Sequence, residues 1–198
     1  MKEQPNTDAG NEEAALLADL KVAGIQCNDI YELVNSRRSY KKAIPVLVEH
    51  LGRVSTPGLK EGIARALAVR EAKGVAGPAL VAAFDAVEQP AVRWAIGNAL
   101  SIVATEAELS DLVRIATTEH YGKAREMVVV ALGKVKADAA AVQALLQLLD
   151  DDEVAGHAVM ALGLLKAPVC RARVAEFLEH PKPWVRKEAK RALAKIDG

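Results

Sequence analysis

Residues that could bind a metal ion recur along this chain as glutamate–histidine pairs. The pairs are Glu49-His50, Glu119-His120 and Glu179-His180. Imidazole and carboxylate groups are common ligands of zinc and iron, so such pairs could form the dyads of a metal-dependent enzyme. Zinc ligands must all lie about 2 Å from one ion. This chemistry therefore depends on whether the fold brings the pairs together.

A second chemical candidate is the acidic run from Asp150 to Glu153. A calcium loop needs alternating oxygen ligands, a glycine and a distal glutamate, and the run lacks that pattern. Carboxylates that precede a helix accept hydrogen bonds from its free N–H groups and favour its dipole, so the run predicts a helix start. The sequence also lacks a glycine-rich phosphate loop and a catalytic Ser-His-Asp or Cys-His arrangement. It therefore predicts no catalytic residue, no metal site and no cofactor.

The elements that would position these residues form a repeat. An Ala-Leu signature recurs at intervals of 30 to 33 residues, with its leucines at Leu67, Leu100, Leu132, Leu162 and Leu193. Each signature ends an apolar-periodic helix that begins near Leu59, Val92, Ala124, Val154 or Val185, and each of these is preceded by another apolar helix. A unit of about 30 residues cannot bury its own apolar face, so it must stack on its copies. The sequence predicts an all-α, right-handed α-solenoid of about five helix pairs.

Stacking separates the three Glu-His pairs, because they fall in the first, third and fifth repeats. Packed helices lie about 10 Å apart, so the pairs cannot share one ion. Each histidine stands near the end of a first helix, where the helix dipole favours it.

Residues 1–10 are polar and are predicted to form a disordered tail, and residues 11–42 to form a helical cap with apolar Leu16, Leu20 and Leu33. The solenoid is expected over residues 43–198, as a single domain with the cap. The chain carries 26 basic and 26 acidic residues, but the N-terminal end is acidic and the C-terminal end basic. This gradient is typical of two solvated ends, or of head-to-tail self-association.

The repeat pattern resembles the HEAT-like repeats of bacterial proteins, a group that includes phycobilin lyase-type repeats. The segments PAVRWAIGNAL and PWVRKEAKRAL match best, and the resemblance covers roughly residues 43–196, although Ala155 stands where the pattern expects arginine. The resemblance implies the fold, but the group includes scaffolds, adaptors, lyases and DNA glycosylases. It also implies a structural ladder that bridges to acids of neighbouring repeats, formed by Lys60, Arg93, Arg125 and Arg186.

Positions that point away from the core stripe of the second helices predict a concave binding groove. Small and apolar residues would form its floor, with one tryptophan and a polar rim, which is typical of a groove for a helix or an extended peptide. The alternative is that strong curvature closes the groove. The predicted partner-binding residues are Glu61, Trp94, Asn98, Glu126, Val130 and Met160.

The predicted function is a non-catalytic protein-binding scaffold or adaptor, whose partner is another protein or peptide. The alternative is a DNA-glycosylase-like or lyase-like helical-repeat enzyme, which Trp94 and Trp184 make worth comparing. Glu61 and Glu126 flank the place of Trp94 in adjacent repeats and would repel phosphates, which disfavours nucleic acid. No apolar run reaches the length of a membrane span and the start of the chain is unlike a signal peptide, so a reduced cytoplasmic protein with two free thiols is expected.

Overall fold

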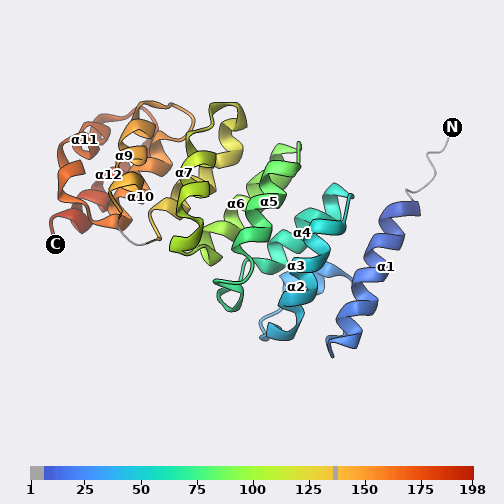
Figure 1. Cartoon of the computed structure of the whole chain (residues 1–198). Helices are drawn as coiled ribbons and strands as arrows, with labels where there is room; N and C mark the ends of the chain where they lie inside the picture. The colour runs from blue at the N-terminus through green and yellow to red at the C-terminus, as the bar shows by residue number, and fades with distance from the viewer. Residues whose placement is uncertain (1–6, 136–137) are drawn as a thin grey trace. The chain divides into compact units, whose positions relative to one another are not determined.

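The structure is a computed structural model that describes residues 7–135 and 138–198 (Figure 1). Within those ranges every regular element is helical. The helices group into two compact units, which we call unit 1 (residues 1–103) and unit 2 (residues 104–198). The all-α solenoid predicted from the repeat is therefore confirmed as a series of stacked helix pairs, while the single-domain organisation stays a prediction.

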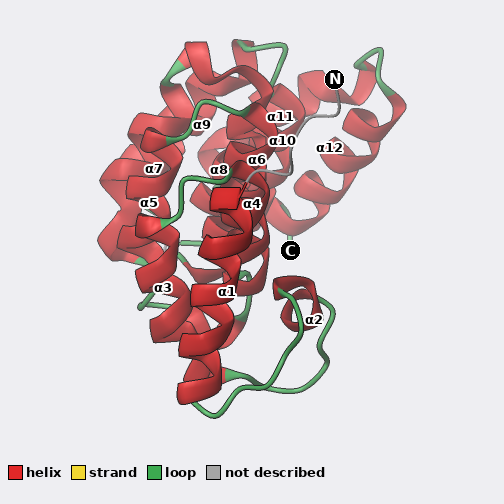
Figure 2. Cartoon of the chain, turned by 90° about the vertical axis from the view of Figure 1, so that its right-hand side faces the viewer, coloured by secondary structure: helices red, strands yellow, loops and turns green. Residues whose placement is uncertain are grey.

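Unit 1 contains the predicted cap and the first two helix pairs. Its helices are α1 (Thr7–Val22), α2 (Ile30–Val34), α3 (Ile44–Arg53), α4 (Pro57–Leu67), α5 (Gly77–Ala86) and α6 (Pro90–Val103). The first helices α1, α3 and α5 pack on one another in sequence, and the second helices α2, α4 and α6 do the same. Figure 2 shows these as two rows.

Unit 2 contains the other three helix pairs. Its helices are α7 (Leu109–Thr117), α8 (Glu126–Leu132), α9 (Ala139–Gln147), α10 (Ala155–Leu165), α11 (Arg171–Ala175) and α12 (Pro183–Ile196). Short 3-10 segments extend α9 and α11 at their C-terminal ends. The second helices α8, α10 and α12 pack side by side, which makes α10 the middle helix of its row.

The apolar stripe of the second helices forms the core of both units, as the periodicity predicts. Residues from the stripe are almost fully buried in each of the five helices, including Ile63, Ile96, Val128, Ala158 and Ala189. Burying one of the larger of these side chains stabilises the fold by about 1.5–3 kcal/mol. The exception is Arg70, which lies beyond the end of α4 and is exposed.

Prolines mark the helix starts as expected. Pro90 begins α6 and Pro183 begins α12, where a missing N–H costs little. The first helix starts earlier than predicted, at Thr7, so residues 7–10 are helical and not part of a tail; the rest of the predicted tail lies outside the described residues. The helix α2 is capped by Asp29, whose side chain accepts the N–H of Glu32.

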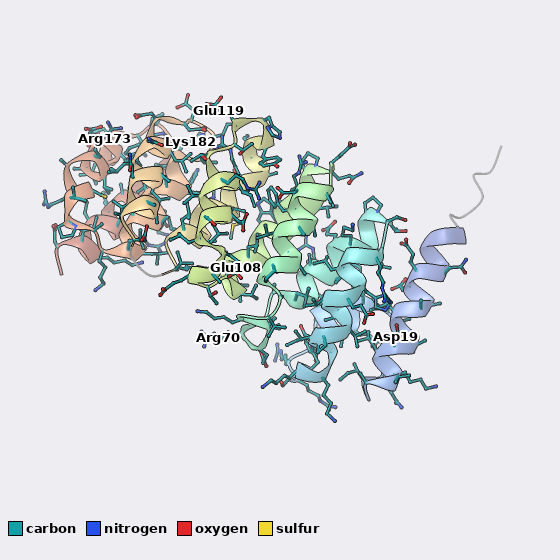
Figure 3. All side chains as sticks on the ribbon, viewed as in Figure 1. Asp19, Arg70, Glu108, Glu119, Arg173 and Lys182 are labelled. Atoms are coloured by element: carbon teal, nitrogen blue, oxygen red, sulfur yellow. The ribbon has the colours of Figure 1, made fainter. Side chains whose placement is uncertain are left out.

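Polar side chains of α1 attach the cap to the first helix pair. Glu12 accepts hydrogen bonds from the backbone N–H groups of Ser55 and Thr56 at 2.7 and 3.0 Å, directly before α4. Asp19, labelled in Figure 3, bonds the buried ring of His50 in α3 at 2.8 Å. The cap therefore joins the unit through specific polar contacts as well as through buried Leu16 and Leu20.

Candidate binding groove

A groove of about 710 Å³ crosses the three second helices of unit 2. Apart from Ala194, its lining residues stand at three places in each repeat: the third, sixth and tenth residue after the start of the core stripe. They lie on α8, α10 and α12, except for Lys134, which follows α8. Such places recur on one face of a helix, so the three helices present matching faces to the groove. The lining residues are Met127, Val130, Lys134, His157, Met160, Leu164, Glu188, Arg191, Ala194 and Lys195.

The groove includes two of the predicted partner-binding residues. Val130 and Met160 both stand at the sixth place and both line the groove. Glu126 is half-buried at its edge, where its charge acts on His157. A pocket is therefore open beside these two residues in unit 2, while its use as a binding groove stays a prediction.

Several residues expected on the groove floor instead pack between helices. Val129 and Val159 are fully buried. A Cβ atom at Gly133 would lie 2.5 Å from the Cα of Ala161, and one at Gly163 would lie 2.6 Å from the Cα of Ala192. These glycines let neighbouring second helices approach closely, so they hold the row together and do not face a ligand.

The other three predicted partner-binding residues belong to unit 1. Trp94 and Asn98 are half-buried on α6. Glu61 is half-buried on α4 and bonds the guanidinium of Arg65, one turn later, at 2.7 and 2.9 Å. The role of these three in binding stays a prediction.

His157, which lines the groove, packs against the ring of Trp184. The ring of Trp184 lies 5.2 Å from that of His157, tilted by 50°. It also covers Gly156, since a Cβ atom there would meet the indole at 2.2 Å. Gly156 directly follows Ala155, the residue that stands where the repeat pattern expects arginine. The missing side chain at Gly156 is what seats the tryptophan.

Burial keeps His157 neutral. Desolvation lowers the pKa of its imidazole, although the nearby charge of Glu126 opposes this shift. Its Nδ1 atom is buried and makes no hydrogen bond within the described part of the chain. The groove wall at His157 is therefore an uncharged aromatic surface at neutral pH.

The wall formed by α12 is basic. The helix PWVRKEAKRALAKI carries five lysines and arginines against one glutamate. That glutamate, Glu188, accepts a hydrogen bond from Arg191 at 2.6 Å. Across the groove, burial lowers the pKa of Lys134, so this ammonium group is partly removed from water.

The predicted arginine ladder is built mainly on backbone carbonyls. Arg93 and Arg125 each donate to a carbonyl nine residues earlier, on Phe84 at 3.3 Å and on Ala116 at 2.8 Å. Both carbonyls lie near the C-terminus of the first helix of the same pair, where orphan carbonyls need donors. Arg186 donates to the carbonyls of His180 and Pro181. Lys60 is half-buried on α4, and its ladder role stays a prediction.

Arg125 shows the predicted bridge to an acid of the next repeat. Its side chain is 1% exposed and donates to Asp151 at 2.5 Å. Asp151 belongs to the acidic run and also accepts the N–H of Glu153 at 3.0 Å. Burial raises the pKa of Asp151, but the bonds from Arg125 and Glu153 outweigh it and hold the pKa below its ordinary value. The acid that completes the bridge was interpreted from sequence only as part of a helix start.

The Glu-His pairs have separate structural partners. Glu49 bonds Arg53 while His50 bonds Asp19. The ring of His120 packs against Tyr121, and that of His180 stacks on Phe177. Across residues 7–135 and 138–198, no group of three histidine, cysteine or acidic side chains could hold a metal ion. Cys27 and Cys170 are free thiols.

A sequence profile of HEAT repeats matches residues 142–198, which include α10 and α12. Among solved structures, an engineered protein from a structural genomics programme is similar over 97% of this chain and 92% of its own, with 21% identity and a TM-score of 0.58. The chain is a helical repeat protein. A designed armadillo repeat protein in complex with the peptide (KR)4 is similar over 98% of this chain and 95% of its own, with 18% identity and a TM-score of 0.58.

A further designed armadillo repeat protein is similar over 98% of this chain, with 18% identity and a TM-score of 0.56. At 18% to 21% sequence identity, the similarity to these solved structures shows a shared fold and nothing more. No curated protein sequence matches the chain significantly. In the described part of the chain, no helix is both long and apolar enough to cross a membrane.

Proposed function

We propose that this repeat protein is a non-catalytic binding scaffold, and that the groove over α8, α10 and α12 receives a segment of another protein. The observation that carries the proposal is the groove itself, in which three consecutive helices present the same three places to one cavity of about 710 Å³. A row of equivalent faces is how stacked repeats build an extended binding surface.

The groove has the composition of a peptide-binding surface. Its floor is formed by Met127, Val130, Met160 and Leu164, and its rim is charged. An apolar centre with a polar rim is typical of protein interfaces, and methionine adapts its shape to different ligands. The designed armadillo repeat protein of similar fold binds a peptide, which supports a peptide as the ligand class.

We also propose that the whole solenoid consists of HEAT-like repeats. The profile match covers the last two repeats, and the Ala-Leu signature extends the pattern toward the N-terminus. Three statements stay predictions from the sequence: that the protein is bacterial, that it is cytoplasmic, and that it associates head to tail.

Affinity capture from a lysate of the source organism tests the groove. Met160→Glu places a carboxylate on the apolar floor, and it should lower partner retention about 30-fold, since a lost anchor costs about 2 kcal/mol. The matched control is Val169→Glu, because Val169 is 74% exposed and lies outside the groove lining. Equal retention by the two variants would show that the groove does not bind the partner.

Trp94→Ala is the third arm of this experiment. It tests the separate prediction that Trp94 in unit 1 anchors a partner. If the variant folds normally and keeps every partner of the wild type, Trp94 is a packing residue, and the groove of unit 2 carries the function alone.

A further inference from the structure

The groove is divided between an apolar side and a basic side. The helix α8 has one charged residue, Glu126, and α10 has none. The neighbouring α12 carries five cations and one anion. A ligand in the groove therefore meets apolar surface on two helices and positive charge on the third.

The cations stand where a ligand would lie. Lys134, Arg191 and Lys195 all line the groove. Arg191 and Lys195 lie on α12, and Lys134 lies in the turn after α8. The anions near the groove are Glu188, which is held by Arg191, and Glu126, which acts on His157. The positive charge facing the groove thus exceeds the negative charge.

A ligand carboxylate would gain from these positions. Because Lys134 is partly removed from water, a carboxylate brought beside it would interact in a lower effective dielectric than on an open surface. A cationic ligand would meet Lys134, Arg191 and Lys195 as like charges, which costs affinity and rejects such partners.

We propose that the groove of unit 2 selects a linear segment of another protein that combines apolar anchors with aspartate or glutamate. The apolar anchors lie over Met127, Val130 and Met160, and the carboxylates face Arg191 and Lys195. This assignment rests on the proposed function and specifies the partner's chemistry. It is opposite in charge to the peptide (KR)4 bound by the designed repeat protein of similar fold.

The dimensions of the row limit the segment. Neighbouring helices pack 8–10 Å apart, so the path from α8 to α12 is about 16–20 Å long. An extended strand rises about 3.3 Å per residue, so about five or six residues cross the groove. The order along the segment follows the helices, with apolar residues over α8 and α10 and acidic residues over α12.

The test uses a displayed library of random dodecapeptides, selected on immobilised full-length protein in parallel with Met160→Glu. Peptides enriched on the wild type should contain apolar residues followed or preceded by Asp and Glu. Enrichment of Lys and Arg would overturn the charge assignment and leave the groove function standing. Equal enrichment on both proteins, or on neither, would overturn the assignment, and the lysate capture then decides the proposed function separately.

A matched pair of charge reversals tests the basic wall, with the most enriched library peptide as the fluorescent probe. Lys195 and Lys187 are both exposed on α12, but only Lys195 lines the groove. Lys195→Glu should weaken binding about tenfold, and Lys187→Glu less than threefold. Equal losses would show a diffuse charge effect and contradict a groove-bound carboxylate.

A second copy of this chain is the competing occupant. Sedimentation velocity of the wild type and Lys195→Glu distinguishes it. A monomer at all concentrations agrees with a separate partner, whereas an oligomer that Lys195→Glu dissociates would overturn the proposal.

Discussion

The same face of the second helices is covered at α4 in unit 1 and lines an open groove in unit 2. At the third place after the start of the core stripe, α4 in unit 1 carries Gly62, and a Cβ atom there would lie 2.7 Å from the side chain of Ile30 in α2. In unit 2 the equivalent places carry Met127, His157 and Glu188, which line the groove. The cap helix therefore covers in unit 1 a place that is open to ligands in unit 2.

The contacts that stabilise each unit internally also differ. In unit 1 the cap contributes buried Ile30 and the hydrogen bonds of Glu12. In unit 2 the buried pair of Arg125 and Asp151 links successive repeats, and Gly133 allows a close helix crossing. The comparison teaches that the same place in the repeat can be packed against another helix or can line an open groove, depending on whether a helix covers it.

Removing Arg125 should give the largest effect, and it should be seen in unit 2. Arg125→Ala removes the donor to Oδ2 of Asp151 and to the carbonyl of Ala116, and leaves the bond from the N–H of Glu153 to Oδ1 of Asp151. Breaking a buried ion pair from one side costs about 3–5 kcal/mol, and the partial exposure of Asp151 favours the lower value. The measurement is urea unfolding followed by Trp184 fluorescence in a Trp94→Phe background, because each unit holds one of the two tryptophans.

Arg186→Ala is the control for this experiment. Arg186 is half-buried and donates to the backbone carbonyls of His180 and Pro181, so its loss should cost about 1 kcal/mol. If Arg186→Ala destabilised the protein as much as Arg125→Ala, the ion pair would not be what distinguishes unit 2.

Truncating Ile30 tests the cover over α4 in unit 1. The side chain is 1% exposed, and Ile30→Ala should cost about 2–4 kcal/mol because it leaves a cavity against Gly62. Trp94 fluorescence in a Trp184→Phe background should report the loss. The exposed Val22→Ala on α1 is the control and should change the free energy of unfolding by less than about 0.5 kcal/mol. A loss reported by Trp184 alone would contradict the assignment to unit 1.

Glycine substitutions separate close packing from open helix surface. Gly133→Ala in unit 2 should destabilise by about 1–3 kcal/mol, because its Cβ would collide with the backbone of Ala161. Gly52→Ala in unit 1 has nothing within 4 Å and lies in α3, so it should stabilise by up to about 1 kcal/mol. Thermal unfolding of the two variants checks the opposite signs. Two shifts of the same sign would show that the helix crossing at Gly133 tolerates a methyl group.

The sequence predicted the fold well because the fold is repeated in one dimension. The buried stripe through Ile63, Ile96 and Val128 and the prolines at the helix starts are local patterns, and five copies reinforce one another. The start of α1 was less accurate, because the polar composition of residues 1–10 predicted a tail, whereas the helix begins at Thr7.

The groove of unit 2 contains two of the six predicted groove residues, and the other four do not line it. Val130 and Met160 were identified, whereas Met127, His157 and Leu164 were not. The reason is that contacts between repeats decide which neighbouring places stay open. At Gly133 the end of α8 packs closely against Ala161 of α10. The sequence of one repeat, taken alone, does not indicate this close contact. The presence of glycine at two equivalent places, Gly133 and Gly163, was the available signal.

The smallest predicted effect concerns acid, and it tests the cap of unit 1 again. Hydrogen bonds from the backbone N–H of Ser55, the Ser55 hydroxyl and the backbone N–H of Thr56 lower the pKa of Glu12 from 4.5 to about 2, although burial opposes this. A pKa lowered by folding means that the native state favours the carboxylate. Its contribution to stability is complete above about pH 4.5 and is lost as the pH falls toward about 2.

The carboxylate of Glu12, on α1, accepts an N–H group at the start of α4, as a helix cap does. Glu12→Gln should therefore lower the free energy of unfolding at pH 7 by about 1 kcal/mol, the usual value of a lost helix cap. The difference from wild type should shrink as the pH is lowered from 4.5 to 2, because protonation then removes the same charge from the wild type. Urea unfolding at pH 7, 4 and 3, followed by Trp94 in the Trp184→Phe background, measures this. A difference that stays constant with pH would mean that Glu12 acts by its shape and not by its charge, and the cap would then be held to unit 1 mainly by its apolar contacts.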